Sequence, residues 1–346
     1  METKSVIISN EFTKFFSFES YDKLFLVADK KVSELWIEKF MEFSNLKKYK
    51  VEIFLIEATE SNKTLETYEK LVKVAIDKSI NRNCAVIGLG GGIIGDLVGF
   101  FAGSYYRGID LYHVPTTLLS QIDSSIGGKT GVNFKNIKNV MGVFYEAKGT
   151  FISSEFLTTL DEEEYISGLG EVLKYYFLGS DKLGQYLKSN AYEILNRNQS
   201  VLNEVIKLCV EKKLEIVVKD PKEMGLRKIL NLGHTFGHGI ELEYHISHGK
   251  SVAWGMEMAF KYSNKKGYIS DELLKLALEL IKQYNLHIEL EFSVERVIEN
   301  MKKDKKNSGD EITLILPVDI CEVGIFKESE SDISDFLRSE FNASKA

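Results

Sequence analysis

The sequence predicts an α/β N-terminal domain with a mostly parallel sheet, followed by a mainly α-helical C-terminal domain. Over roughly the first 155 residues, short β-rich apolar runs alternate with helical patterns, which is typical of parallel strands covered by helices on both faces. Beyond that point helical patterns dominate. With 346 residues, 44% hydrophobic and 27% charged, the chain is long enough for two cores and has an ordinary globular composition.

The elements of the N-terminal part follow from the pattern of apolar residues. The runs at 24–28 (LFLVA) and 51–56 (VEIFLI) are apolar and β-rich, so both predict strands. We expect further strands at 5–8 and 111–114, a strand and turn at 85–92, and helices at 33–43, 64–81 and 93–105. Their alternation predicts a largely parallel sheet with helices on both faces.

One apolar run has the length of a membrane span. The twenty residues from Cys84 to Gly103, CAVIGLGGGIIGDLVGFFAG, contain a single charge, Asp96. The run begins like a strand and carries a glycine triplet. We therefore expect a buried strand, a glycine turn and a buried helix, and no membrane association.

The C-terminal part consists mainly of helical patterns. Helices are expected at 161–177, 181–196, 199–219, 227–243, 250–266, 271–284 and 293–303, with short strands at 311–316 and 320–325. The change of pattern predicts two domains, 1–155 and 156–346.

Composition narrows the possible partners. The net charge of −7 argues against broad binding of nucleic acids or anionic membranes, although a local basic pocket remains compatible with it. The three cysteines, Cys84, Cys209 and Cys321, are far apart and form no CxxC pair. The N-terminal segment METKSVIISNEF lacks an apolar core of signal-peptide length. Together these features predict a cytoplasmic protein.

A glycine turn connects the expected strand at 85–92 to the following helix. Glycine lets the backbone turn tightly and approach a ligand closely, and the N–H groups at a helix start favour a phosphate. Gly95, Gly99 and Gly103, spaced by four, form a smooth face for another backbone or a cofactor. The turn departs from GxGxxG, so a tight structural turn is the alternative to nucleotide binding.

A polar run follows at 115–139, PTTLLSQIDSSIGGKTGVNFKNIKN, where the two domains are expected to meet. Clefts between domains are favoured ligand sites. Lys129 and Lys138 can form charge-assisted bonds with phosphates. The segment SSIGGKT lacks the leading glycine of a P-loop, so we exclude that class of NTPase. A solvated loop is the alternative to a binding segment.

Four of the six histidines lie between Gly225 and Val252: His234, His238, His245 and His248. His234 and His238 are four residues apart, so on a helix they share one face. Clustered neutral imidazoles suit a divalent metal such as zinc, whereas packed or surface histidines are the alternative.

Glu171 and Lys174 also share a helical face, and most such pairs are solvated surface pairs. Because this pair has apolar and glycine neighbours, a buried role is plausible. The Glu171 carboxylate would then complete a His2Glu metal site with His234 and His248.

Seven ordered motifs together resemble the 3-dehydroquinate synthase family: GLGGGIIGDLVGF, YYRGI, VPTTLLSQIDSSIGGKTGVN, KNVMGVFY, GLGEVLKY, GLRKILNLGHTFGH and HGKSVAWGM. The resemblance runs from Asp29 to the DKK run at 304–306. It implies a dehydroquinate synthase-like fold, with a Rossmann-like NAD-binding domain and a helical metal- and substrate-binding domain. It also implies a homodimer in the cytoplasm.

The implied activity is that of an NAD- and metal-dependent carbon–oxygen lyase of the shikimate pathway, in aromatic amino-acid biosynthesis. Enzymes of that family convert 3-deoxy-D-arabino-heptulosonate 7-phosphate to 3-dehydroquinate and phosphate. They do so by transient oxidation with NAD, β-elimination of phosphate, re-reduction and intramolecular aldol closure. The implied cofactors are NAD and a divalent metal, Zn²⁺ or Co²⁺.

The same resemblance assigns roles to individual residues. The metal ligands would be Glu171, His234 and His248. The NAD site would be lined by Asp29, Glu60, Lys63, Gly92, Ile93, Ile94, Gly95, Asp96, Thr116, Thr117, Asp123, Lys129, Lys138, Phe156, Leu157, Thr158 and Thr159. The substrate phosphate would be held by Lys129, Asn139, Asn231, His238 and either Lys305 or Lys306.

Lys213 and Arg227 would bind the substrate carboxylate, with Lys174 and Glu223 nearby. Arg107 would reach the site of a neighbouring subunit. Lys250 replaces the glutamate usual in this family, directly after the expected ligand His248 and Gly249.

Other functions remain open at this point. A sister sugar-phosphate cyclase such as 2-deoxy-scyllo-inosose synthase would share the fold, NAD and metal, but its substrate lacks the carboxylate that Lys213 and Arg227 suit. A metal-dependent polyol dehydrogenase of the glycerol-dehydrogenase type would release NADH and would need fewer phosphate-binding cations. A third alternative is a binding protein that has lost its activity.

Overall fold

The computed structural model describes residues 5–135, 137–241, 243–302 and 311–343. The chain forms two compact units: Met1–Asp161 with Arg197–Leu214, and Glu162–Asn196 with Glu215–Ala346. The boundary between two domains at residue 155 stays a prediction. The unit that carries the N-terminal segment also includes residues 197–214.

A six-stranded sheet forms the centre of the first unit, in the order β1-β8-β5-β4-β2-β3. Every pairing within it is parallel, which confirms the predicted sheet. Five of the strands match predicted ones, whereas β8 was not predicted; its sequence, GTFI, begins with a glycine, a residue depleted in strands. The strands are β1 Ser5–Ile8, β2 Lys23–Asp29, β3 Val51–Ile56, β4 Cys84–Gly90, β5 Asp110–Pro115 and β8 Gly149–Ile152.

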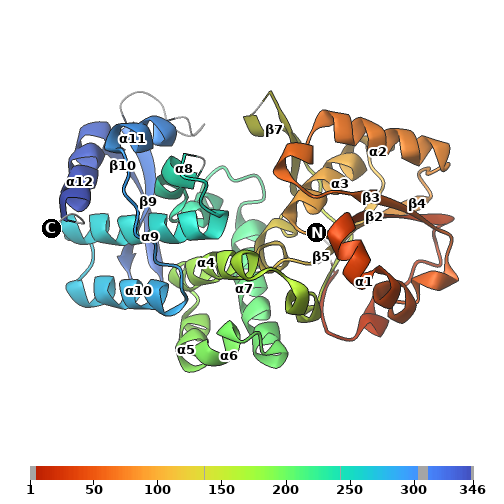
Figure 1. Cartoon of the computed structure of the whole chain (residues 1–346), viewed down its shortest axis with the longest axis horizontal. Helices are drawn as coiled ribbons and strands as arrows, with labels where there is room; N and C mark the ends of the chain where they lie inside the picture. Colours follow the sequence, from red (N-terminus) through yellow and green to blue (C-terminus); the bar gives the residue numbers. More distant parts are fainter. Residues whose placement is uncertain (1–4, 136, 242, 303–310, 344–346) are drawn as a thin grey trace. The chain divides into compact units, whose positions relative to one another are not determined.

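Helices cover both faces of this sheet (Figure 1). Along β2 the side chains alternate, since Phe25 and Val27 join one core and Leu24 and Leu26 the other. The first core contains residues of α2 Leu65–Asp77 and α3 Gly92–Ser104, and the second contains residues of α1 Lys30–Phe43. Both faces of β2 are therefore buried, which accounts for its continuous apolar run.

The apolar run of membrane-span length is divided as predicted into β4 and α3. Gly91 lies between them as the residue that caps α3. Nowhere in the described ranges is a helix both long and apolar enough to cross a bilayer.

The polar run at 115–139 contributes to an antiparallel hairpin, β6 Lys129–Phe134 and β7 Ile137–Phe144, which was not predicted. Two glycines of α3 make room for it. A Cβ atom on Gly99 would lie 2.3 Å from Thr130 Cγ2, and one on Gly103 would lie 2.8 Å from Val143 Cγ2. This part of the smooth glycine face therefore receives side chains of the hairpin, not a cofactor.

The second unit is mainly helical, as predicted, with a two-stranded antiparallel sheet, β9 Glu311–Asp319 and β10 Glu322–Ser329. The expected helix at 227–243 is instead a 3₁₀ helix, η7 Leu226–Asn231, and then α8; between them Gly233 takes a φ of 78°. The helices are α4 Glu162–Phe177, α5 Asp181–Ser189, α6 Ala191–Leu195, α8 His234–Glu241, α9 His248–Lys265, α10 Asp271–Gln283, α11 Val294–Lys302 and α12 Glu330–Ala343. Of these, α12 was not predicted, and α7 Gln199–Lys219 belongs mostly to the first unit.

Glycines bring α4 and α8 against α9. A Cβ on Gly170 of α4 would lie 2.2 Å from the Gly249 carbonyl oxygen, and one on Gly237 of α8 would lie 2.6 Å from the Ser251 oxygen. The Gly249 N–H donates to Ser167 Oγ at 2.9 Å. Backbones in such close contact bring the side chains next to these glycines within reach of one another.

Candidate active site

Three side chains from α4, α8 and α9 converge on one point in the second unit. Glu171 follows Gly170, and His248 precedes Gly249, so the close contact of α4 and α9 places them together. Glu171 Oε1 lies 3.5 Å from His234 Nε2 and 3.4 Å from His248 Nε2. Glu171 is fully buried, whereas the two histidines are partly exposed. The structure therefore gathers the three residues named as metal ligands.

The outer nitrogens of both histidines have hydrogen-bond acceptors. His234 Nδ1 lies 3.2 Å from the Leu232 carbonyl oxygen, and His248 Nδ1 lies 3.1 Å from Glu241 Oε2. Since a carbonyl and a carboxylate only accept, each Nδ1 carries a hydrogen, and whenever the ring is neutral its Nε2 presents a lone pair. Both Nε2 atoms face Glu171.

The spacing of the donor atoms fits a small divalent cation. Bonds of 2.0–2.1 Å in a tetrahedral arrangement place neighbouring donors about 3.3 Å apart. The distances from Glu171 to the two imidazoles are 3.4 and 3.5 Å. Two imidazoles and one carboxylate are the ligand set of many catalytic zinc sites, in which substrate or water takes the fourth position.

A second group, His238, Glu241 and His248, also has donor atoms within 4.8 Å of one another. His238 and Glu241 lie on the same face of α8 as His234, because four and seven residues correspond to about one and two turns. In this group Glu241 already accepts the hydrogen bond of His248 Nδ1. The first group is therefore the better metal site.

Lys174 compensates the negative charge of the buried Glu171 carboxylate. Its ammonium forms an ion pair with Glu171 Oε2, while Oε1 faces the histidines. Lys174 is 1% exposed and Glu171 0%, so this pair is buried and not a solvated surface pair. One oxygen of Glu171 is thus occupied by a fixed cation and the other is directed at the metal position.

The two imidazoles differ in their protonation. Burial lowers the pKa of His234 to about 3. Burial also disfavours the charged form of His248, but the hydrogen bonds that its ring donates to Glu171 and Glu241, and their negative charge, outweigh it and raise its pKa to about 10. Without metal, His234 is therefore neutral and His248 is protonated at neutral pH.

We expect the metal-free protein to show this difference directly. In an NMR pH titration, the His248 ring should stay charged at pH 8 and the His234 ring should stay neutral at pH 5. Since a metal must displace the His248 proton, metal affinity should rise with pH up to about pH 10. A His248→Asn variant assigns the resonance, and a His248 ring that titrates near 6.5 would contradict the prediction.

The segment before α8 carries further predicted residues. Asp220 accepts backbone hydrogen bonds from Met224, Gly225 and Arg227, which lower its pKa and fix the turn that leads into η7. Arg227 is 2% exposed and donates from Nη1 to the Pro221 carbonyl at 2.7 Å. Asn231 Nδ2 donates to Glu223 Oε1 at 3.1 Å. Arg227, Asn231 and Glu223 are therefore held in one ordered segment.

In the first unit, the predicted NAD residues gather at the carboxyl edge of the sheet. The chain leaves β2 toward β3 on one side, and β4 and β5 follow on the other side of β2. Ligands bind at such switch points in open parallel sheets. Asp29 ends β2, and a Cβ on Gly90, at the end of β4, would lie 3.3 Å from Asp29 Cβ.

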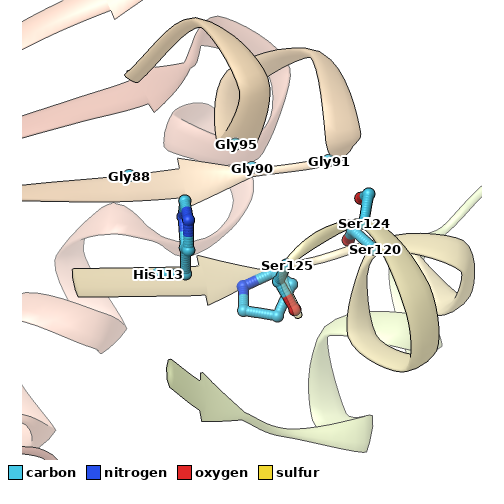
Figure 2. A pocket seen from close by; sticks show the side chains of 9 residues that line it. Gly88, Gly90, Gly91, Gly95, His113, Ser120, Ser124 and Ser125 are labelled. Atoms are coloured by element: carbon cyan, nitrogen blue, oxygen red, sulfur yellow. The ribbon is translucent and has the colours of Figure 1, made fainter. Parts of the chain in front are cut away.

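The glycine turn at this edge fits a phosphate. Figure 2 shows the pocket at this turn, with Gly90 and Gly91 at the end of β4, Ser120, Ser124 and Ser125 on the segment after β5, and His113 extending from β5 toward β4. A Cβ on Gly91 would lie 3.0 Å from Thr117 Cγ2, and one on Gly92 3.1 Å from Ser124 Oγ, so side chains there would crowd the turn.

The N–H groups of Gly92 and its successors open α3. The buried hydroxyls of Thr116, Ser124 and Ser125 have no hydrogen-bond partner among the described residues. These polar groups suit a nucleotide phosphate.

Two buried lysines of the first unit are paired with acids. Lys63 Nζ lies 2.5 Å from both Asp96 Oδ2 and Asn139 Oδ1. Lys213 binds the carboxylate and the carbonyl oxygen of Asp123. Burial raises the pKa of Asp96, although Lys63 opposes this shift. Each lysine is thus charge-compensated in the ligand-free structure.

Asp96, Asn139 and Lys129 also line a pocket of about 320 Å³ beside the β6–β7 hairpin. That volume lies within the range of small-ligand sites. One residue predicted for NAD, Asp96, one predicted for the substrate phosphate, Asn139, and one predicted for both, Lys129, therefore meet at one cavity of this unit.

The other predicted residues are more dispersed. Glu60 accepts from Asn133 Nδ2 at 2.7 Å. Phe156 and Leu157 are core residues, so only their backbone could face a ligand; Thr158 and Thr159 follow them in η6 Ser154–Thr159. Arg107, His238 and Lys138 are exposed, whereas Lys305 and Lys306 lie outside the described residues.

Sequence reasoning missed Glu241, the partner of His248 Nδ1. Its signal is the spacing His-x3-His-x2-Glu, which places all three side chains on one face of α8.

Comparison with known proteins agrees with this geometry. The family model described as 3-dehydroquinate synthase N-terminal matches residues 53–167, and the one described as 3-dehydroquinate synthase C-terminal matches residues 168–307. The 3-dehydroquinate synthase of Thermoanaerobacter sp. (strain X514) is 37% identical over 342 residues, 94% of this chain and 96% of that protein. That of Alkaliphilus oremlandii (strain OhILAs) is 39% identical over 314 residues, 90% of this chain and 86% of that protein.

Solved structures of sister cyclases share the fold. A 2-epi-5-epi-valiolone synthase from Streptomyces hygroscopicus, with NAD+ and Zn2+ bound, has a TM-score of 0.90 at 24% identity, covering 99% of this chain and 98% of that one. A 2-deoxy-scyllo-inosose synthase with carbaglucose-6-phosphate, NAD+ and Co2+ has a TM-score of 0.84 at 24% identity, covering 96% of each chain. With both family models and relatives of 37–39% identity spanning most of the sequence, this chain belongs to the 3-dehydroquinate synthase family.

Proposed function

We propose that this protein converts 3-deoxy-D-arabino-heptulosonate 7-phosphate to 3-dehydroquinate and phosphate, with NAD and a divalent metal as resident cofactors. The observation that carries the proposal is the Glu171, His234 and His248 donor set, with donor distances of 3.4 and 3.5 Å. Relatives of 37–39% identity named 3-dehydroquinate synthase, and sister cyclases bound to NAD+ with Zn2+ or Co2+, support it.

The chain supplies positions and charges for this chemistry. When bound, NAD accepts and returns a hydride, and the cation lowers the pKa of the substrate hydroxyl that is oxidised. Glu171, His234 and His248 would hold the cation. The Lys174 ammonium keeps the buried Glu171 carboxylate charged and oriented by occupying its other oxygen. Fixed charges of this kind stabilise charge development without reorganisation.

The nucleotide would lie at the carboxyl edge of the parallel sheet. The N–H groups at the start of α3 would receive its phosphates, with the hydroxyls of Thr116 and Ser124 beside them. Asp29, at the end of β2, accepts from the Lys31 backbone N–H at 3.3 Å and remains at the strand end, where a ribose hydroxyl would donate to it.

Substrate recognition would use cationic and amide side chains. We assign phosphate binding to Lys129, Asn139, Asn231 and His238, and carboxylate binding to Arg227 and Lys213. In the ligand-free structure Asp123 neutralises Lys213, so the incoming carboxylate would compete with a carboxylate already present. Arg227 is almost fully buried, and a buried guanidinium strongly favours a substrate that brings an anion.

A homodimer and a cytoplasmic location belong to the same proposal. Arg107 is exposed, and both it and Tyr106 have positive φ values, 65° and 52°. Such backbone costs roughly 1–3 kcal/mol per residue and persists where the surroundings impose it. Presentation of Arg107 to a neighbouring subunit would account for that cost.

A phosphate-release assay with two substrates tests the function. Protein loaded with NAD and Zn²⁺ or Co²⁺ should release phosphate from the heptulosonate phosphate with no net NADH. Chelator-treated protein should release none. Release from glucose 6-phosphate alone would transfer the assignment to a 2-deoxy-scyllo-inosose synthase, and accumulation of NADH would indicate a dehydrogenase.

A further inference from the structure

Glu241 lies behind the candidate metal site, on the side of His248 that faces away from Glu171. As the last residue of α8, it stands seven residues after His234 and shares its face. Its Oε2 atom lies 3.1 Å from His248 Nδ1 and 3.4 Å from Ser251 Oγ, which donates to it. Glu241 is 13% exposed, so the contact is shielded from competing water.

This contact determines which nitrogen of His248 carries the hydrogen. A carboxylate only accepts, so Nδ1 must donate and Nε2 must keep its lone pair in the neutral ring. The hydrogen bond also fixes the rotation of the ring, and with it the 3.4 Å distance from Nε2 to Glu171 Oε1. With the opposite hydrogen placement, Nε2–H would point at the metal position and prevent binding.

The ring of His234 is held in the same tautomer by a different hydrogen-bond acceptor. Its Nδ1 lies 3.2 Å from the Leu232 carbonyl oxygen, a backbone group that no side-chain substitution removes. His248 is the first residue of α9 and lies within a short loop-to-helix segment, so its ring depends on a side-chain partner. Of the two described Nδ1 acceptors, Glu241 is therefore the one that a side-chain substitution can remove.

We propose that Glu241 is a positioning residue that holds His248 in the tautomer and orientation required by the metal, and is not itself a ligand. The inference rests on the proposed function only in taking Glu171, His234 and His248 as the ligands. The competing arrangement is the second group, in which Glu241 and His238 bind the metal directly together with His248. In the first arrangement Glu241 must accept a hydrogen bond from His248, whereas in the second its carboxylate must bind the metal.

Metal affinity of purified protein, without substrate, distinguishes them. We expect Glu241→Ala to weaken Zn²⁺ or Co²⁺ binding about 10–100-fold, the usual effect of losing a partner behind a histidine ligand. Glu241→Gln should recover much of this affinity, because its amide oxygen still accepts from Nδ1. His238→Ala should retain the metal. Affinities come from competition with a chromophoric chelator at fixed pH.

Two further measurements separate positioning from loss of structure. The visible absorption of bound Co²⁺ should keep its wild-type shape in Glu241→Gln, since the ligands are unchanged, and the melting temperature of the metal-free protein should stay close to wild type. The matched control is Glu243→Gln, two residues away, whose carboxylate pairs with Arg296 on the surface and contacts no histidine. Its metal affinity should equal that of the wild type.

Three results would overturn the inference. Wild-type affinity in Glu241→Ala would show that His248 needs no anchor. Equal losses in Glu241→Gln and Glu241→Ala, together with metal loss in His238→Ala, would make Glu241 a ligand. An altered Co²⁺ spectrum in Glu241→Gln would do the same. Because no substrate is used, these outcomes are independent of whether phosphate is released from the heptulosonate phosphate.

Discussion

His234→Ala should lose bound metal and catalytic activity together. The variant removes one of the three donor atoms, His234 Nε2, which lies 3.5 Å from Glu171 Oε1. Only the donors of Glu171 and His248 are left. A Lewis acid at a reacting hydroxyl is worth several kcal/mol, and each 1.36 kcal/mol is a factor of ten in rate. We therefore expect kcat to fall by at least about 10³-fold, with metal content measured by mass spectrometry after dialysis.

His245→Asn is the matched control for this variant. His245 lies in the same stretch but is exposed, and its φ of 52° is one that asparagine tolerates. The control should keep both metal and activity. If His234→Ala retained full metal content and full activity, His234 would not be a ligand.

The candidate metal ligands could be predicted from the sequence because each stands in a short, distinctive motif. His-x3-His spacing on a helix and the isolated His248 indicated a metal, and GLGEVLKY supplied Glu171. What the spacing did not reveal is why the three meet. That depends on Gly170 and Gly249, whose missing side chains let α4 and α9 touch. Close backbone approach between distant segments has no local periodicity, so sequence patterns do not report it.

The fold was predictable where burial produces a clear period. The strands β2, β3 and β4 are continuous apolar runs, and β3 was predicted at its observed bounds. The β6–β7 hairpin was missed because β7 is largely exposed and β6 contains glycine, lysine and asparagine. Its stability comes from the glycine face of α3, a tertiary contact that overrides weak strand propensity.

The sequence also did not predict which of the polar site residues form ion pairs with one another. Lys63, Asp96, Lys213 and Asp123 were each assigned to a ligand, yet the structure pairs each lysine with an aspartate. The lysines are buried and close to aspartates, so they would be costly to leave uncompensated before a ligand arrives. Residue types at a site follow from motifs, whereas their partners in the ligand-free state follow from packing.

Lys174→Met should destabilise the metal-free protein by about 3–5 kcal/mol, the range for removing one partner of a buried ion pair. Glu171 is fully buried, and its carboxylate would lose the ammonium that now binds Oε2. A bound cation supplies that missing charge, so Zn²⁺ should restore more stability to the variant than it adds to the wild type. Urea unfolding with and without metal measures both effects.

Two variants make this prediction specific. Lys207→Met removes a lysine with the same three-residue spacing from Glu204, but that pair is 48% and 30% exposed, so stability should change by no more than about 1 kcal/mol. Glu171→Gln with Lys174→Met removes both charges and should recover much of the lost stability while abolishing metal binding. If Lys174→Met alone were as stable as the wild type without metal, the ammonium would not be what keeps Glu171 ionised in the core.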